Sequence, residues 1–168
     1  MSKTKRLTLT TVMIALGTVI GILEANFLNF NVIPGSKIGL SNIVCLITLY
    51  LFDFKTALCV NSARAIFVGL MYSGPSSLIY SFTASVVSVV VMSVAKNTFK
   101  DNISAIGVSV AGAFFHNLTQ VLVAMIISGS VNMIYYFSYL AFVSVVTGIF
   151  TGAVTSGIIN RIKKDLIL

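Results

Sequence analysis

Residues 103–128 read ISAIGVSVAGAFFHNLTQVLVAMIIS and contain no charged side chain. A helix needs about 20 predominantly apolar residues to cross the ~30 Å hydrocarbon core of a bilayer, so this stretch is long enough to span a membrane. Short segments rich in polar or turn-forming residues, at 96–102 and 129–132, bound it on both sides. The pattern predicts a transmembrane helix.

The rest of the chain repeats this pattern. Hydrophobic residues make up 57% of the 168 and charged residues only 9%, whereas soluble domains average about 25% charged. The composition predicts a single integral membrane domain over residues 1–168, an all-α bundle of six transmembrane helices. The second and third stretches are short for a bilayer, so one is expected to be kinked or partly re-entrant, and the spans to number five or six. The stretches lie at roughly 7–24, 38–52, 56–73, 75–95, 103–128 and 133–159.

Basic residues outnumber acidic ones by 11 to 4, which gives a net charge of +7. They bracket the apolar stretches and form no stripe interleaved with aromatic residues, so no nucleic acid is expected as a partner. Cytoplasmic loops of membrane proteins carry the excess of Lys and Arg. Six spans with both termini in the cytoplasm satisfy this rule for all basic residues except Lys37 and Arg64. The pattern predicts a multi-pass protein of the cell membrane.

Arg64 lies near the middle of its predicted span. A charge at that depth costs about 2.5–3.5 kcal/mol on insertion scales, so Arg64 is expected to face the bundle interior and to contact a partner or a ligand. Asn61, one turn earlier, would line the same surface. Two interpretations stay open: Arg64 binds a ligand, or it is a structural residue satisfied by backbone carbonyls or by Glu24.

His116 and Gln120 lie one turn apart on one face of the stretch at 103–128. Strongly polar side chains in the body of an apolar span are candidate ligand contacts. A hydrogen-bonded packing role is the alternative for His116. We expect no metal site, because no second His, Cys pair or carboxylate stands at ligand spacing.

Residues 34–42 read PGSKIGLSN and open the second span from the outside. Ser36 would cap this helix, and the segment 73–75 would open the fourth span on the same side. Helix N-termini favour negative charge, and Lys37 and Arg64 would add positive charge. These features predict an anionic or polar ligand that enters from outside. The alternative is a capped helix with the Lys37 side chain extended to the lipid headgroups.

An ordered set of short motifs points to a family. The motifs are PGSKIGLSN at 34–42, AR at 63–64, IYS at 79–81, IGVSVAGA at 106–113, HN at 116–117, Gln120, and TG at both 147–148 and 151–152. Over nearly its whole length the chain resembles the family named heptaprenyl diphosphate synthase component I, or Gx transporter, which resembles the S components of energy-coupling factor (ECF) transporters. The resemblance implies a six-helix subunit that captures a vitamin-like compound and docks onto a transmembrane coupling subunit driven by two ATPases.

Subunit docking in S components is commonly supported by an Ala-xxx-Ala pattern on the first helix. Here Ala15 is followed four residues later by Val19, and only Gly17 and Gly21 keep small residues at this spacing. The resemblance therefore assigns docking to Ala15, Gly17 and Gly21. Close packing inside the bundle is the alternative, as it is for the glycines of the sixth stretch.

The family's enzymatic name can be compared with the chemistry of the chain. Prenyl diphosphate synthesis needs paired aspartates that hold Mg²⁺ on the diphosphate, whereas Glu24, Asp53, Asp101 and Asp165 all stand apart. The sequence also has no phosphate-binding Gly-x-x-x-x-Gly-Lys-Ser/Thr loop. We expect the chain not to be an enzyme and to use no cofactor itself, with ATP used by partner subunits.

The sequence thus favours the substrate-binding subunit of an ECF-type importer, surrounded by membrane lipid. It would capture an anionic vitamin-like or quinone- or isoprenoid-pathway precursor in the outer half of the bundle, under a loop at 26–36. Two other hypotheses stay open: a membrane accessory subunit of a prenyl diphosphate synthase, and a channel or scaffold whose polar residues only pack. The residues expected to bind the ligand are Lys37, Asn42, Asn61, Arg64, His116, Asn117 and Gln120.

Overall fold

The computed structural model describes residues 3–27 and 39–167, with side chains for all of these except 25, 27, 72–77, 101 and 163–167. The described residues form six α-helices and three short segments of other helix types, and they contain no strand, which confirms the all-α class for this part of the chain. The α-helices are α1 (Lys3–Phe27), α2 (Asn42–Leu51), α3 (Phe54–Val68), α4 (Gly74–Phe99), α5 (Ala105–Ser128) and α6 (Ile134–Ile167). The short segments are the π-helical turn η1 (Gly69–Ser73) and the 3-10 turns η2 (Lys100–Asn102) and η3 (Val131–Met133).

Five of the described helices, α1, α3, α4, α5 and α6, are long and apolar enough to cross a membrane. The protein is therefore a helical membrane protein. α2 is the exception, because its 10 residues rise only about 15 Å, half of the ~30 Å hydrocarbon core. The predicted span at 38–52 is thus corrected to a short helix that begins at Asn42. Gly39, just before it, has a φ of +92°, a conformation that favours glycine and interrupts a right-handed helix.

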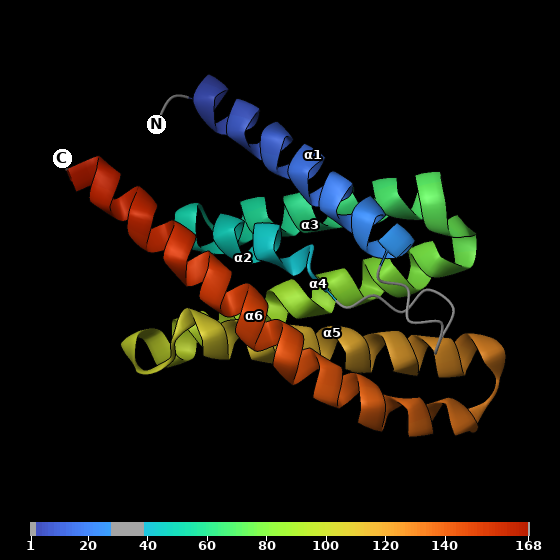
Figure 1. Ribbon diagram of the computed structural model, residues 1–168. Helices are drawn as coiled ribbons and strands as arrows, with labels where there is room; N and C mark the ends of the chain where they lie inside the picture. Colours follow the sequence, from blue (N-terminus) through green and yellow to red (C-terminus); the bar gives the residue numbers. More distant parts are fainter. Residues whose placement is uncertain (1–2, 28–38, 168) are drawn as a thin grey trace.

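The connection between the third and fourth spans also differs from the prediction of a break at 73–75. α3 continues through η1 into α4 with no non-helical residue between them. The chain reverses its direction at this segment (Figure 1). A Cβ on Gly69 would lie only 2.7 Å from Leu78 Cβ, so the missing side chain lets α3 and α4 approach closely beside the reversal.

α2 is the central element of the bundle. α5 packs against both α4 and α6, α4 packs against α3, and α1 packs along α3. α2 contacts all five other α-helices, and seven of its ten residues are buried. In Figure 1 α1 begins and α6 ends at the same end of the molecule. A short helix in this position is shielded from lipid by the five long ones.

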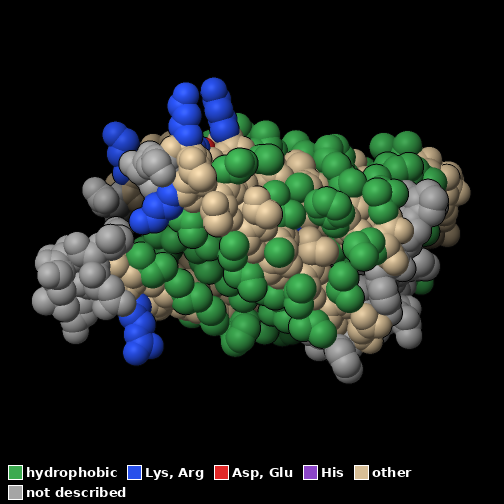
Figure 2. All heavy atoms as spheres, turned by 90° about the horizontal axis from the view of Figure 1, so that it is seen from above, with side chains coloured by type: hydrophobic (Ala, Val, Ile, Leu, Met, Phe, Trp, Pro, Cys, Tyr) green, Lys and Arg blue, Asp and Glu red, His purple; other side chains and the backbone are tan. Residues whose placement is uncertain are grey.

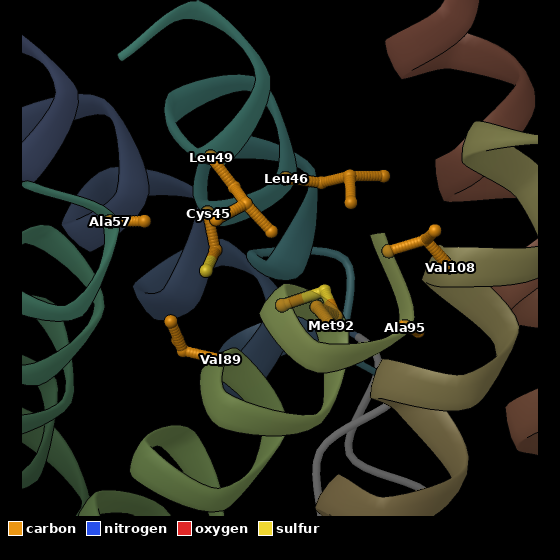
Figure 3. Close-up of a cluster of buried hydrophobic side chains, with 8 residues drawn as sticks. All are labelled: Cys45, Leu46, Leu49, Ala57, Val89, Met92, Ala95 and Val108. Atoms are coloured by element: carbon orange, nitrogen blue, oxygen red, sulfur yellow. The ribbon is translucent and has the colours of Figure 1, made fainter. Parts of the chain in front are cut away.

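The apolar core surrounds the body of α2. Cys45, Leu46 and Leu49 of α2 pack against side chains of α3, α4 and α5 (Figure 3). Because lipid tails are as apolar as these side chains, the cluster stabilises the bundle chiefly through close van der Waals packing. Its other members are Ala57, Val89, Met92, Ala95 and Val108.

Basic side chains gather at the end of the molecule where α1 begins and α6 ends, which we call the basic end (Figures 1 and 2). Hydrophobic side chains cover the middle of the face shown in Figure 2. At the basic end Arg6 of α1 forms an ion pair with Asp53, the N-cap of α3, and donates to Thr56 Oγ1 at 2.6 Å. Lys96 of α4 donates to the Leu49 carbonyl near the end of α2 at 2.7 Å. Charged side chains therefore join α1 to α3 and α4 to α2 at this end.

Asp53→Ala is expected to lower the free energy of unfolding by about 1 kcal/mol, because it removes the N-cap of α3 and the partner of Arg6. Asp53 lies outside the spans, where hydrogen bonds from the Thr56 hydroxyl and N–H, and then from Arg6, lower its pKa from 3.8 to about 2. Since the pKa is lower in the folded state, this stabilisation is fully present above 3.8 and is lost as the pH falls through about 2. The Asp53 side chain is 48% exposed, so water screens the ion pair and the cap contributes most.

Thermal unfolding of wild-type and Asp53→Ala protein in mild detergent, at a series of pH values from neutral down to about 2, measures this contribution. The difference between the two proteins should stay constant above the unfolded-state pKa and shrink below it. Ser104→Ala is the matched control, because it removes the N-cap of α5, whose hydroxyl does not titrate in this range. An Asp53→Ala difference that persisted at the lowest pH would contradict the assignment.

Candidate functional site

Arg64 lies at the centre of a buried hydrogen-bond network between α3, α4 and the start of α2. Its Nε donates to Asn61 Oδ1 and its Nη2 to Ser85 Oγ, each at 3.1 Å. Its Nη1 donates to the hydroxyl of Ser41, which directly precedes α2. Asn61 Nδ2 donates to the Ser85 carbonyl at 3.1 Å and so ties α3 to α4. All three guanidinium nitrogens thus have partners within the chain, and Asn61 shares the surface with Arg64 as predicted.

Glu24, near the end of α1, balances the charge of Arg64. Its carboxylate accepts hydrogen bonds from the Gly39 N–H and, at 3.3 Å each, from the N–H and the hydroxyl of Ser41. Ser41 therefore connects two opposite charges, and Glu24 and Arg64 are only 2% and 4% exposed. The dipole of α2 favours a carboxylate at this helix start. This geometry agrees with the structural alternative for Arg64.

The prediction of two helix starts open to an outside ligand is corrected by these contacts. The N–H groups before α2 already hydrogen-bond to Glu24, and α4 continues directly from η1, so neither helix presents a free start in the described residues. Ser36, Lys37 and most of the loop at 26–36 lie outside the described residues.

Gly17 and Gly21 of α1 are buried against α3. A Cβ on Gly17 would lie 3.1 Å from Arg64 Cδ, and a Cβ on Gly21 would lie 2.9 Å from Val68 Cγ2. The two glycines therefore let α1 approach the helix that carries Arg64. Of the three residues assigned to docking, only Ala15 is exposed. Docking onto a partner subunit stays a prediction, and on this geometry it falls to Ala15.

Three of the buried polar side chains that have atoms without a hydrogen-bond partner among the described residues form what we call the unpaired polar layer. Asn42 of α2, Ser81 of α4 and Gln120 of α5 are 5%, 3% and 5% exposed. In both amides the nitrogen and the oxygen are unsatisfied. Leaving a buried polar group unsatisfied costs about 1–3 kcal/mol, so such groups are rare and call for an explanation. A ligand that binds there is one such explanation.

The register of α4 and α5 places Ser81 and Gln120 at the same depth. Ser88 of α4 donates to the Gly112 carbonyl of α5 at 2.9 Å. The two helices run in opposite directions. Ser81 lies about two turns before Ser88 on α4, and Gln120 lies about two turns after Gly112 on α5, so both residues lie at about the same depth. Ser81 shares a helix face with Ser88, which meets α5, and with Ser85, which meets α3. Ser81 therefore faces the bundle interior, between α3 and α5.

Asn42 adjoins this level from α2. It directly follows Ser41, to which Arg64 donates, and Arg64 also donates to Ser85, one turn from Ser81. The unpaired polar layer thus borders the Arg64 network at two points, one on α2 and one on α4. The charges hold the start of α2 in place beside the unsatisfied groups.

His116 and Asn117 are buried on α5 beside this layer. Asn117 Nδ2 donates to Ser144 Oγ at 2.8 Å and to the Leu140 carbonyl at 3.4 Å, so it ties α5 to α6. His116 lies one turn from Gln120 on the same helix face, nearer the basic end. On the other side of Gln120 an apolar cluster begins, formed by Val121, Leu140, Met125 and Phe137.

The unpaired polar layer contains two of the predicted ligand contacts, Asn42 and Gln120, and a third residue, Ser81, that the sequence did not single out as part of the site. Ser81 could have been found from the spacing of Ser81, Ser85 and Ser88, which places three hydroxyls on one face of an apolar helix. Asn61 and Arg64 lie beside the layer and bind each other. Ligand binding by any of these residues stays a prediction.

The site residues that the structure describes supply hydrogen-bond donors and acceptors. No group of three His, Cys, Asp or Glu side chains that could hold a metal ion occurs in the described ranges. The two carboxylates with described side chains, Glu24 and Asp53, both accept hydrogen bonds from neighbours in the chain. Such an arrangement can bind and orient a small molecule.

The fold and the site together define a polytopic helical membrane protein with a buried hydrogen-bonding layer around a short central helix. The chain belongs to the family described as heptaprenyl diphosphate synthase component I, whose model matches residues 13–158. This confirms the family identified from the sequence motifs. No curated protein and no solved structure matches the chain significantly. The family description names one component of a synthase, which agrees with a chain that is not catalytic by itself.

Proposed function

We propose that this protein is the substrate-binding subunit of an ECF-type importer and captures a small polar compound inside its helix bundle. The observation that carries the proposal is the unpaired polar layer, which presents unsatisfied donors and acceptors from Asn42, Ser81 and Gln120. A ligand that hydrogen-bonds to these groups recovers the free energy that is lost while they are unsatisfied. Polar groups kept within membrane spans at such a cost commonly mark substrate pathways.

The distribution of charge supports uptake from outside. By the positive-inside rule we assign the basic end, where α1 begins and α6 ends, to the cytoplasm. Ser81 lies about two turns from the first residue of α4 and five from its last, which is at the basic end, so the layer belongs to the outer half of the bundle. ATP would be hydrolysed by two partner ATPases, coupled through a transmembrane subunit that contacts the exposed face of α1 around Ala15.

Gln120→Leu is expected to have opposite effects on stability and on binding. It removes two unsatisfied buried atoms, so the ligand-free protein should gain about 1–3 kcal/mol of unfolding free energy. It also removes hydrogen bonds to the ligand, so affinity should fall about tenfold, since each 1.4 kcal/mol of lost binding energy is a factor of ten. The compound that co-purifies from native membranes, identified by mass spectrometry, provides the probe for the affinity measurement, and unfolding of the ligand-free protein measures the gain in stability.

Thr155→Val is the matched control. The hydroxyl of Thr155 is buried and also has no partner among the described residues, but it lies near the basic end of α6, beyond Gly152. This variant should gain stability and keep wild-type affinity. If Gln120→Leu bound the compound as tightly as Thr155→Val does, the layer would not be the binding site.

The family description favours a second candidate, an accessory subunit that anchors or activates a prenyl diphosphate synthase at the membrane. This function predicts that the chain co-purifies with a soluble synthase, and that prenyl transfer depends on its presence. The importer predicts co-purification with a membrane coupling subunit and ATPases, together with ATP-dependent uptake. Mass spectrometry of the proteins recovered with the tagged chain from native membranes separates the two.

A further inference from the structure

We infer that the proposed site takes an uncharged ligand, a conclusion that rests on the proposed function and narrows its substrate class. The two buried charges beside the site already neutralise each other. Ser41 accepts a hydrogen bond from Arg64 and donates one to Glu24, and all three residues are at least nine-tenths buried. The network next to the unpaired polar layer therefore carries no net formal charge.

An ionic ligand would disturb this balance whatever its sign. An anion would bring a second negative charge beside Glu24, and like charges repel strongly in a buried site that solvates them poorly. A cation would meet Arg64, while the Glu24 carboxylate is already engaged by the Gly39 N–H and by two groups of Ser41. In either case the ligand would also bring an uncompensated charge into a buried site, which costs further free energy.

The groups that do lack partners are neutral and can both donate and accept. Asn42 and Gln120 each offer an amide NH₂ and a carbonyl oxygen, and Ser81 offers a hydroxyl. Their complement is a compound with uncharged carbonyl, hydroxyl or amide groups. The cluster around Val121 and Leu140 adjoins Gln120 and suits an apolar body on the same compound. This class differs from the anion expected when Arg64 was counted as a free positive charge.

The experiment uses the full chain in lipid nanodiscs and a small-molecule extract of the cells that make the protein. Anion and cation exchangers divide the extract into an anionic pool, a cationic pool and an uncharged pool that passes through both. The uncharged pool should raise the unfolding temperature by about 5–10 °C, as saturation with a ligand does for a protein of this size. Gln120→Leu should lose most of this rise, and Thr155→Val should keep it.

The outcomes separate the inference from the function on which it rests. Stabilisation by the anionic or the cationic pool alone would overturn the uncharged ligand and leave the binding function standing. Stabilisation by none of the pools would overturn both. Glu24→Gln provides a second arm, because it leaves the positive charge of Arg64 unbalanced and should shift the response towards the anionic pool. A Glu24→Gln protein that folds and keeps the wild-type preference would show that Glu24 does not set the charge of the ligand.

Discussion

Arg64→Met is expected to lower the free energy of unfolding by about 3–5 kcal/mol, because it leaves the Glu24 carboxylate buried without a compensating charge. The variant also removes the hydrogen bonds that Arg64 donates to Asn61, Ser41 and Ser85, three residues that are themselves buried. Methionine keeps most of the side-chain length, so the loss reports the charge and its hydrogen bonds more than a cavity. Unfolding in mild detergent with increasing denaturant measures the effect.

Two further variants identify the cause of that loss. Glu24→Gln combined with Arg64→Met removes both charges, and this double variant should recover much of the stability lost by Arg64→Met alone, since replacing a whole buried pair is often close to neutral. Arg161→Met makes the same substitution at an exposed residue and should change stability by less than about 0.5 kcal/mol. A double variant no more stable than Arg64→Met would show that Glu24 is not the partner that matters.

Gly152→Ala is expected to cost about 1–3 kcal/mol, because α5 and α6 leave no room for a side chain there. A Cβ on Gly152 would lie 2.5 Å from Ile106 Cα and 3.0 Å from Ser109 Cβ. The first of these atoms is backbone and cannot rotate away, so the helices must separate. The 2.6 Å contact between the hydroxyls of Ser109 and Thr151 should then lengthen.

Gly157→Ala, one and a half turns further along α6, is the matched control. A Cβ on Gly157 would meet nothing within 4 Å, so only the helix preference of alanine acts, and stability should rise by about 0.5–1 kcal/mol. Thermal unfolding of both variants under one condition gives the comparison. Equal effects of the two substitutions would mean that α5 and α6 do not meet closely at Gly152.

The candidate site shows where sequence reasoning succeeds and where it stops. The polar side chains of Asn42, Arg64 and Gln120 are conspicuous because their neighbours are apolar, and burying them in a membrane is costly enough to predict an inward orientation. The hydrogen-bond partners of these side chains cannot be predicted in the same way. Glu24 is linked to Arg64 through the Ser41 hydroxyl, because the turn at Gly39 places Ser41 between α1 and α3, and helical periodicity contains no information about that turn.

The sequence by itself determined the helical membrane class, the positions of five long helices and the interior location of the polar residues. Length, hydropathy and the cost of burying charge act locally along the chain, so each can be read one segment at a time. Only the tertiary structure decided that α2 is a short central helix and that Gly17 and Gly21 pack internally. It also decided that Arg64 is hydrogen-bonded within the chain, whereas Asn42, Ser81 and Gln120 have atoms without a partner among the described residues. Those outcomes depend on which faces of separate helices meet, and hydrogen bonds between side chains far apart in sequence are formed only once the bundle has assembled.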